Sequence, residues 1–85
     1  MEERRFKERI YELVARIAKA VDSPPRLEML EVLAQGERSV EAVARQTGLS
    51  VANASQHLQV LREARLVEGR KTEAFEERLI NGMRA

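Results

Sequence analysis

The stretch TGLSVANASQHLQVL, residues 47–61, carries no formal charge in a chain of which 34% of the residues are charged. Its polar side chains are amides and hydroxyls, together with one histidine, and they both donate and accept hydrogen bonds. Two of the amides, Gln56 and Gln59, lie three residues apart and would share one face of a helix. Amide side chains can pair with the edges of adenine bases, so this face is chemically able to read the major groove of a duplex. A solvated helix surface with no binding role is the alternative interpretation.

A helix over residues 51–64 would sort these side chains by direction. At about 100 degrees per residue, turning Ala54, Leu58 and Leu61 inward leaves the polar residues on the outward side and its flanks. The outward and flanking residues are Ala52, Asn53, Ser55, Gln56 and Gln59. Ala52 is small enough to permit close approach and could contact a thymine methyl group.

His57 is the only histidine, and the chain has no cysteine. One histidine without a cysteine does not assemble a transition-metal site within one chain, and no disulfide is possible. His57 falls at the edge of the inward side, so we expect it to be packed or hydrogen-bonded. The sequence also lacks a Gly-rich phosphate loop and a nucleophile with a base beside it. We therefore expect no enzyme, no metal and no cofactor.

The first predicted helix spans residues 6–21, because its apolar residues recur at spacings of three and four and draw one stripe. That stripe either packs on its own domain or also forms the seam of a dimer. Two prolines behind Ser23 end this helix and begin a second one, which ends near Gly36. The core must be aliphatic, since the chain has only three aromatic residues.

The uncharged stretch lies at the second of two further helices. Ser39 is a suitable N-cap for a helix over residues 40–47, and Ser50 for the helix over 51–64. Gly48 suits the left-handed position that follows a helix. Two short helices joined by a short glycine-containing turn have the geometry of a helix-turn-helix, here at about residues 39–64.

Residues 55–67 read SQHLQVLREARLV. This segment resembles the ArsR/SmtB group of bacterial winged-helix repressors, whose pattern is Ser-x-His-Leu-x-x-Leu-x-x-Ala-x-Leu-Val. The resemblance extends back through IAKAVDSPPRL at residues 17–27 and covers roughly residues 13–70. Metal-sensing members carry a cysteine pair where this chain has Ser39 and Glu41. The effector, if there is one, is therefore not readable from the sequence.

The resemblance implies that residues 51–64 form a recognition helix and that the chain binds double-stranded DNA as a homodimer. Two such helices would enter successive major grooves of a palindromic site, about 34 Å apart. Hydroxyls and backbone amides at the helix starts could hold phosphates. The residues expected at the DNA are Ser39, Ser50, Val51, Ala52, Asn53, Ser55, Gln56, Gln59, Arg62, Arg70 and Lys71.

The C-terminus departs from the family, which normally forms a two-stranded wing after Leu66-Val67. Apolar residues between 75 and 83 are spaced as in a helix, and Thr72 could cap it. We therefore expect a C-terminal helix packed against the first helix, and a shortened or absent wing of which Arg70 and Lys71 remain. The expected dimer interface comprises Phe6, Ile10, Leu13, Val14, Ile17, Phe75, Leu79 and Met83.

Taken whole, 85 residues predict one mainly helical domain over residues 1–85, with dimerisation helices at both ends. A net charge of +1 neither favours nor excludes a polyanionic partner. The charged N-terminus and the lack of a long apolar run favour a cytoplasmic protein with no membrane partner.

The sequence leaves two functions open. The first is a sequence-specific, DNA-binding transcriptional repressor that acts as a homodimer. The alternative is a wingless protein-interaction module that dimerises with a related regulator and modulates it without binding DNA.

Overall fold

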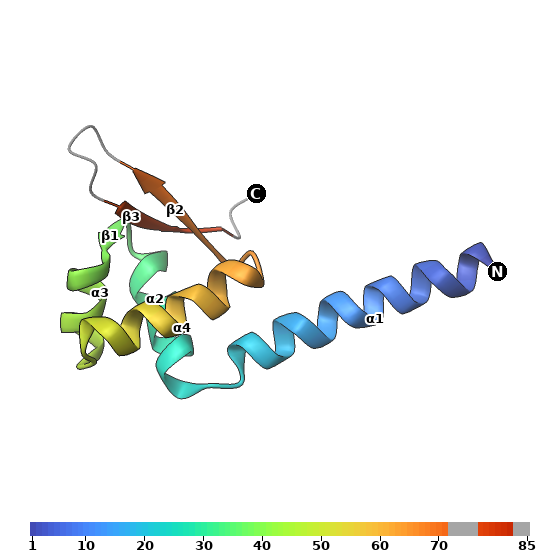
Figure 1. Ribbon diagram of the computed structural model, residues 1–85, viewed down its shortest axis with the longest axis horizontal. Helices are drawn as coiled ribbons and strands as arrows, with labels where there is room; N and C mark the ends of the chain where they lie inside the picture. The colour runs from blue at the N-terminus through green and yellow to red at the C-terminus, as the bar shows by residue number, and fades with distance from the viewer. Residues whose placement is uncertain (72–76, 83–85) are drawn as a thin grey trace.

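The computed structural model describes residues 1–71 and 77–82. Within them the chain forms four helices and three short strands, which confirms the mainly helical prediction. In chain order they are α1 (Glu2–Val21), α2 (Pro24–Ala34), β1 (Arg38–Ser39), α3 (Val40–Thr47), α4 (Val51–Glu63), β2 (Val67–Lys71) and β3 (Glu77–Asn81). Figure 1 shows α2, α3 and α4 gathered under the strands at one end, with α1 projecting away from them.

Serine side chains begin three of the helices, as the sequence predicts. The Oγ atoms of Ser23, Ser39 and Ser50 each accept a hydrogen bond from a backbone N–H in the first turn, at 3.4, 3.2 and 3.1 Å. Such caps satisfy donors that have no partner within the helix. Gly48 ends α3 with a φ of 72°, a left-handed conformation that glycine adopts without steric penalty. These local signals fix the turn between α3 and α4.

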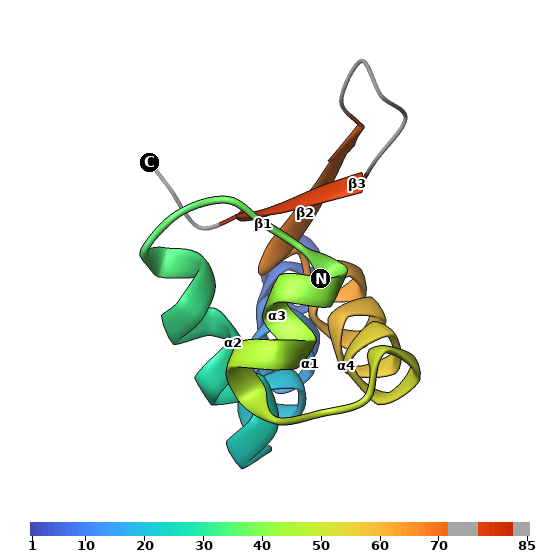
Figure 2. The same ribbon diagram turned by 90° about the vertical axis from the view of Figure 1, so that its left-hand side faces the viewer.

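The core lies between α2, α3, α4 and the sheet. Its most deeply buried large side chains are Met29, Val43, Leu61 and Leu79, each 0% exposed. All the buried hydrophobic residues of the described chain are aliphatic, as expected from the few aromatics. Helix α1 contributes Ala20 as its only buried residue, so most of this helix stands outside the core. Seen from the end opposite to the N-terminus, the strands lie above the three packed helices (Figure 2).

The prediction of a C-terminal helix is wrong for residues 77–82, the part of this segment that the structure describes. Residues 77–81 form the central strand of an antiparallel sheet with the order β1-β3-β2. Leu79 pairs with Arg38 of β1 and with Gly69 of β2, and its side chain is in the core. It is therefore unavailable to a partner subunit, contrary to the predicted dimer interface. Phe75 and Met83, with the predicted cap Thr72, lie outside the described residues.

The absence of a wing, one of the two outcomes expected from the sequence, is also wrong. Strands β2 and β3 are five residues each and pair in register from Val67 with Asn81 to Lys71 with Glu77. They form a hairpin beside α4, and its free end points toward the same end of the molecule as α3 and the start of α4 (Figure 1). The alternative function, a protein-interaction module without a wing, is therefore not favoured, because the wing is present.

Candidate nucleic-acid interface

The outward face of α4 is placed as the sequence predicts. Ala54, Leu58 and Leu61 are buried in the core, and the opposite side of the helix is exposed to solvent. The exposed residues are Val51, Ala52, Asn53, Ser55, Gln56 and Gln59. Gln59 donates a hydrogen bond from Nε2 to Oε1 of Glu63 at 3.3 Å, and both side chains are exposed. The structure therefore brings six of the predicted DNA contacts onto one exposed side of α4, which is uncharged over residues 51–61 and has the carboxylate of Glu63 next to Gln59.

Ser50 lies at the start of this face, and its hydroxyl oxygen is the cap of α4. Replacing it with alanine should lower the free energy of unfolding by about 1 kcal/mol, because an N–H of the first turn loses its acceptor. Urea denaturation measures this difference. Ser55→Ala is the matched control, since it removes an exposed hydroxyl from inside the same helix, where alanine is the better helix former. Equal destabilisation by both changes would contradict the cap.

Ser39 is not brought to this face. Its side chain is buried, with 9% of the residue exposed, and its Oγ is occupied by the N–H of Ala42. The residue also pairs with Arg78 of β3 as part of β1. A phosphate contact by the Ser39 hydroxyl, expected from the sequence, is therefore excluded by burial: the residue joins α3 to the sheet.

Arg70, one of the two predicted cations of the wing, has a carboxylate partner. Arg70 of β2 stands directly opposite Arg78 of β3, and like charges in such a cross-strand pair destabilise a sheet. Glu37, just before β1, lies between them, 3.6 Å from Nη1 of Arg70 and 3.3 Å from Nε of Arg78. Lys71 ends β2, at the free end of the hairpin. Glu37 thus offsets the repulsion between the two arginines and joins both wing strands to the loop before β1.

Arg62 points to the wing and not to the outward face of α4. Its guanidinium makes two hydrogen bonds to the carboxylate of Glu77, Nη1 to Oε1 at 2.9 Å and Nη2 to Oε2 at 3.3 Å. The side chains of Arg62 and Glu77 are 36% and 32% exposed. Sequence reasoning missed Glu37, Gly69, Glu77 and Arg78, because it assigned the last two to a helix and had no signal for pairs between distant residues.

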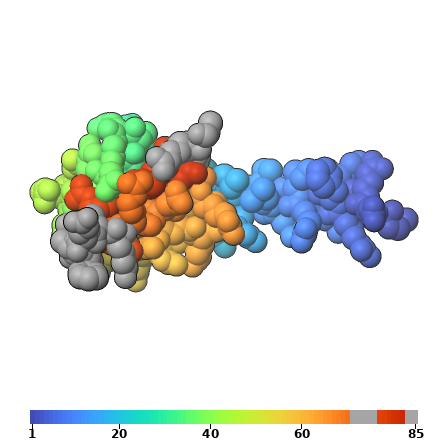
Figure 3. All heavy atoms as spheres, turned by 90° about the horizontal axis from the view of Figure 1, so that it is seen from above, coloured from blue at the N-terminus to red at the C-terminus, as the bar shows by residue number. Residues whose placement is uncertain are grey.

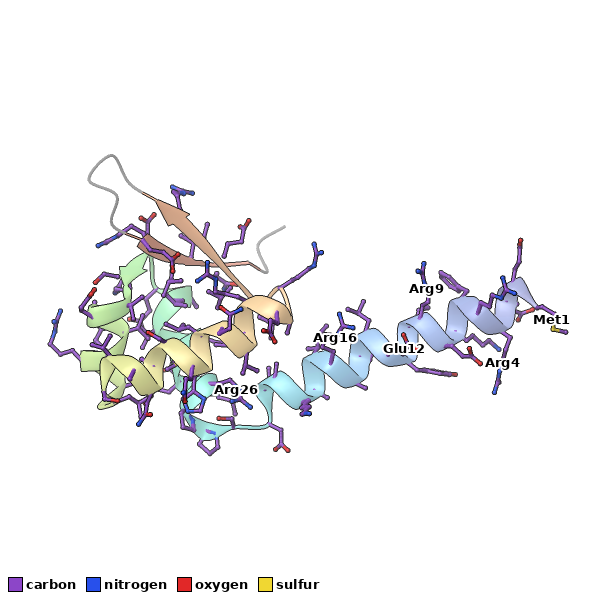
Figure 4. All side chains as sticks on the ribbon, viewed as in Figure 1. Met1, Arg4, Arg9, Glu12, Arg16 and Arg26 are labelled. Atoms are coloured by element: carbon purple, nitrogen blue, oxygen red, sulfur yellow. The ribbon has the colours of Figure 1, made fainter. Side chains whose placement is uncertain are left out.

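His57 has the hydrogen-bonded position that the sequence predicts. Its Nδ1 lies 3.0 Å from Nη1 of Arg26, and because arginine only donates, Nδ1 is the acceptor. Arg26 also donates to the last-turn carbonyls of α1, from Nε to Ala20 at 2.6 Å and from Nη2 to Lys19 at 3.4 Å. Figure 4 shows Arg26 where α1, α2 and α4 meet. One guanidinium therefore joins α1 and α2 to α4.

Beside this junction lies a hollow of about 480 Å³ between α1 and α4. Its lining includes Arg16 and Lys19 of α1 and Glu63 of α4. No group of three or more potential metal ligands occurs within residues 1–71 and 77–82. In the same part of the chain, no helix has the length and apolar character needed to cross a membrane.

The apolar stripe of α1 is left uncovered by the rest of the molecule. Phe6, Ile10, Leu13 and Val14 are 64%, 42%, 51% and 57% exposed, and only toward the end of the helix does Ile17 pack against the core. In the space-filling view, α1 stands clear of the remaining elements (Figure 3). The first of the two sequence interpretations, a stripe covered by its own domain, therefore holds only for the last turns of the helix.

Residues 23–69, more than half of the 85-residue chain, match the family described as bacterial regulatory protein, arsR family. The chain belongs to the ArsR family. One relative, the HTH-type transcriptional regulator Rv0324 of Mycobacterium tuberculosis, is 50% identical over 58 residues. That match covers 68% of this chain and 26% of the relative, so the chain spans about a quarter of that protein's length.

Solved structures of the ArsR type share the fold. The homodimeric winged helix-turn-helix DNA-binding domain of Mb0332 from Mycobacterium bovis, a possible ArsR-family transcriptional regulator, is 39% identical with a TM-score of 0.84. The match covers 89% of this chain and 69% of that one. The transcriptional repressor BigR from Xylella fastidiosa is 32% identical with a TM-score of 0.74, covering 95% and 81% of the two chains. This chain is thus a member of the ArsR family with a winged helix-turn-helix fold.

Proposed function

We propose that residues 1–85 form a sequence-specific DNA-binding domain that represses transcription as a homodimer. Helix α4 of each copy would enter one of two successive major grooves, and the wing would lie along the adjacent backbone. The observation that carries the proposal is the exposed side of α4 over residues 51–61. Its amides and hydroxyls face solvent, while Ala54, Leu58 and Leu61 are buried in the core. A cytoplasmic location, with access to the chromosome, is part of the proposal.

Homodimer formation is supported by the stripe on α1. Large apolar side chains exposed along one helix mark a surface for association, and a chain of this size buries a smaller share of its surface than larger domains do. The M. bovis domain, 39% identical, is described as homodimeric, which supports dimer formation by this chain. A second copy would bury the stripe and place two copies of α4 under one symmetry axis.

The surface offers two kinds of group to DNA. Gln56, Gln59 and their neighbours are suited to base edges, whereas exposed cations such as Arg70 are suited to phosphates. With few cations on the proposed surface, we expect a moderate salt dependence and a large share of specificity from the amides.

Selection from a randomised duplex library tests the proposal. We expect enrichment of an inverted repeat whose half-sites lie about 10–10.5 base pairs apart, centre to centre, because the two recognition helices are related by a two-fold axis. Light scattering on the same sample should give the mass of a dimer. A library that shows no enrichment, together with no retention of any duplex at low salt, would contradict DNA binding by this chain.

A further inference from the structure

Arg62 reaches the wing by crossing one strand to contact the next. It starts in the last turn of α4, passes over β2 at Gly69 and ends at Glu77 of β3. A Cβ atom at residue 69 would lie 2.7 Å from Nη2 of Arg62, 3.2 Å from its Cζ and 3.2 Å from Cδ of Glu77. Real Cβ atoms do not approach a nitrogen at 2.7 Å. Glycine at this position therefore leaves the space that the ion pair occupies.

The contact has the geometry of a strong pair. Two parallel N–H···O bonds between guanidinium and carboxylate fix the orientation of both groups as well as their distance. Arg62 lies three residues after Gln59, so one helix carries both the outward amides and this contact. Glu77 is the first residue of β3, at the free end of the hairpin. The pair therefore spans the angle between α4 and the wing.

We propose that Arg62 and Glu77, admitted by Gly69, are positioning residues that hold the wing at a fixed orientation to α4 for DNA binding. Arg62 acts through Glu77 and is not a phosphate ligand. This inference rests on the proposed function, since its main readout is affinity for DNA. The proposed function and this inference can fail separately. The proposed function is tested by whether the unmodified protein binds DNA, whereas the inference is tested by whether a substitution weakens or tightens that binding.

The direction in which Glu77→Gln changes the affinity for DNA distinguishes two possible roles of Arg62. If Arg62 were a phosphate ligand held back by Glu77, Glu77→Gln would free a cation and remove a negative charge near DNA, so binding would tighten. If the pair orients the wing, the same change loosens the wing and binding weakens. Simple electrostatics and the positioning role thus predict opposite results.

The experiment measures binding of the selected palindromic duplex at two salt concentrations. We expect Glu77→Gln and Arg62→Gln each to weaken binding about tenfold, with the double variant no weaker than either one, because both remove the same interaction. The salt slope should stay unchanged in Arg62→Gln, whereas loss of one phosphate contact per protomer would lower it by about 2 per dimer. The charge swap Arg62→Glu with Glu77→Arg should recover most of the affinity.

Glu68→Gln is the matched control, since Glu68 is an exposed carboxylate on β2 of the same hairpin. It should leave binding unchanged or tighten it slightly. Gly69→Ala should reproduce the loss of Glu77→Gln, and add nothing to it when the two are combined. Circular dichroism and thermal unfolding confirm that each variant is folded. Tighter binding by Glu77→Gln, a lower salt slope for Arg62→Gln, or no rescue by the swap would overturn the inference.

Discussion

Replacing Gln56 and Gln59 together with alanine should remove selective binding while leaving binding to random duplex nearly unchanged. Each bidentate amide-to-adenine hydrogen-bond pair discriminates by about 1–3 kcal/mol. Removing even one such pair from each protomer should weaken binding of the selected palindrome by at least about 30-fold. Phosphate contacts are untouched, so the affinity for random sequence should hold. Fluorescence anisotropy with the two duplexes measures the ratio.

Gln35→Ala is the control for this double substitution. Gln35 is also an exposed glutamine, but it ends α2, outside the α4 face. Both glutamines of α4 are exposed, so neither change should alter the free energy of unfolding beyond a few tenths of a kcal/mol. A double variant that keeps the ratio between palindrome and random duplex would show that α4 does not read bases.

A glutamate at Leu13 should separate the two copies. Leu13 is 51% exposed in one chain, so the change is tolerated by the monomer, but in a dimer it would bury an unpaired charge on each side. Such a charge destabilises by roughly 3–5 kcal/mol, which is at least a hundredfold weaker dimer. Binding of the palindrome should fall as well, because each half-site is then bound independently. Sedimentation equilibrium and anisotropy measure the two effects.

Ala15→Glu is the control for Leu13→Glu. It adds the same charge to an exposed residue of α1 that lies away from the apolar stripe. It should leave both the dimer and its DNA binding intact. Dissociation by both variants would point to a general charge effect, and dissociation by neither would place the dimer seam elsewhere.

Helix α4 and its exposed side were readable from the sequence because their signals are local. Ser50 and Gly48 mark the turn before it, and the spacing of Leu58 and Leu61 defines the buried side. Once that side is fixed, the direction of Gln56 and Gln59 follows from helix geometry. The structure confirms each of these steps.

The wing was misread because its stability is not local. In β3, only Leu79 is buried within a sequence that is otherwise polar and charged, apart from Ile80, so residues 77–81 show little strand preference. Their backbone partners come from β1, about 40 residues earlier, and from β2 across the hairpin. Pairing with strands at such distances overrides local propensity. The ion pair between Arg62 and Glu77, and those of Glu37 with Arg70 and Arg78, could not be predicted for the same reason.

The apolar stripe of α1 illustrates a third case, in which the sequence left two interpretations. An apolar stripe of this width indicates that the helix packs against another surface. The sequence does not show whether that surface belongs to the same domain or to a second copy. The structure decides the matter for one copy, because α1 projects from the core and buries only Ala20. In the proposed dimer, the second copy covers the part of the stripe that is exposed in one copy.

Because α1 buries only Ala20, the core of one copy does not depend on most of this helix. Folding of one copy and association of two copies would therefore be separate steps. At protein concentrations below the dissociation constant of the dimer, the number of dimers rises with the square of the monomer concentration. Operator occupancy would then respond to a twofold change in expression with a change of about fourfold, by the same mass action. The concentration of the protein would thus change operator occupancy more than proportionally.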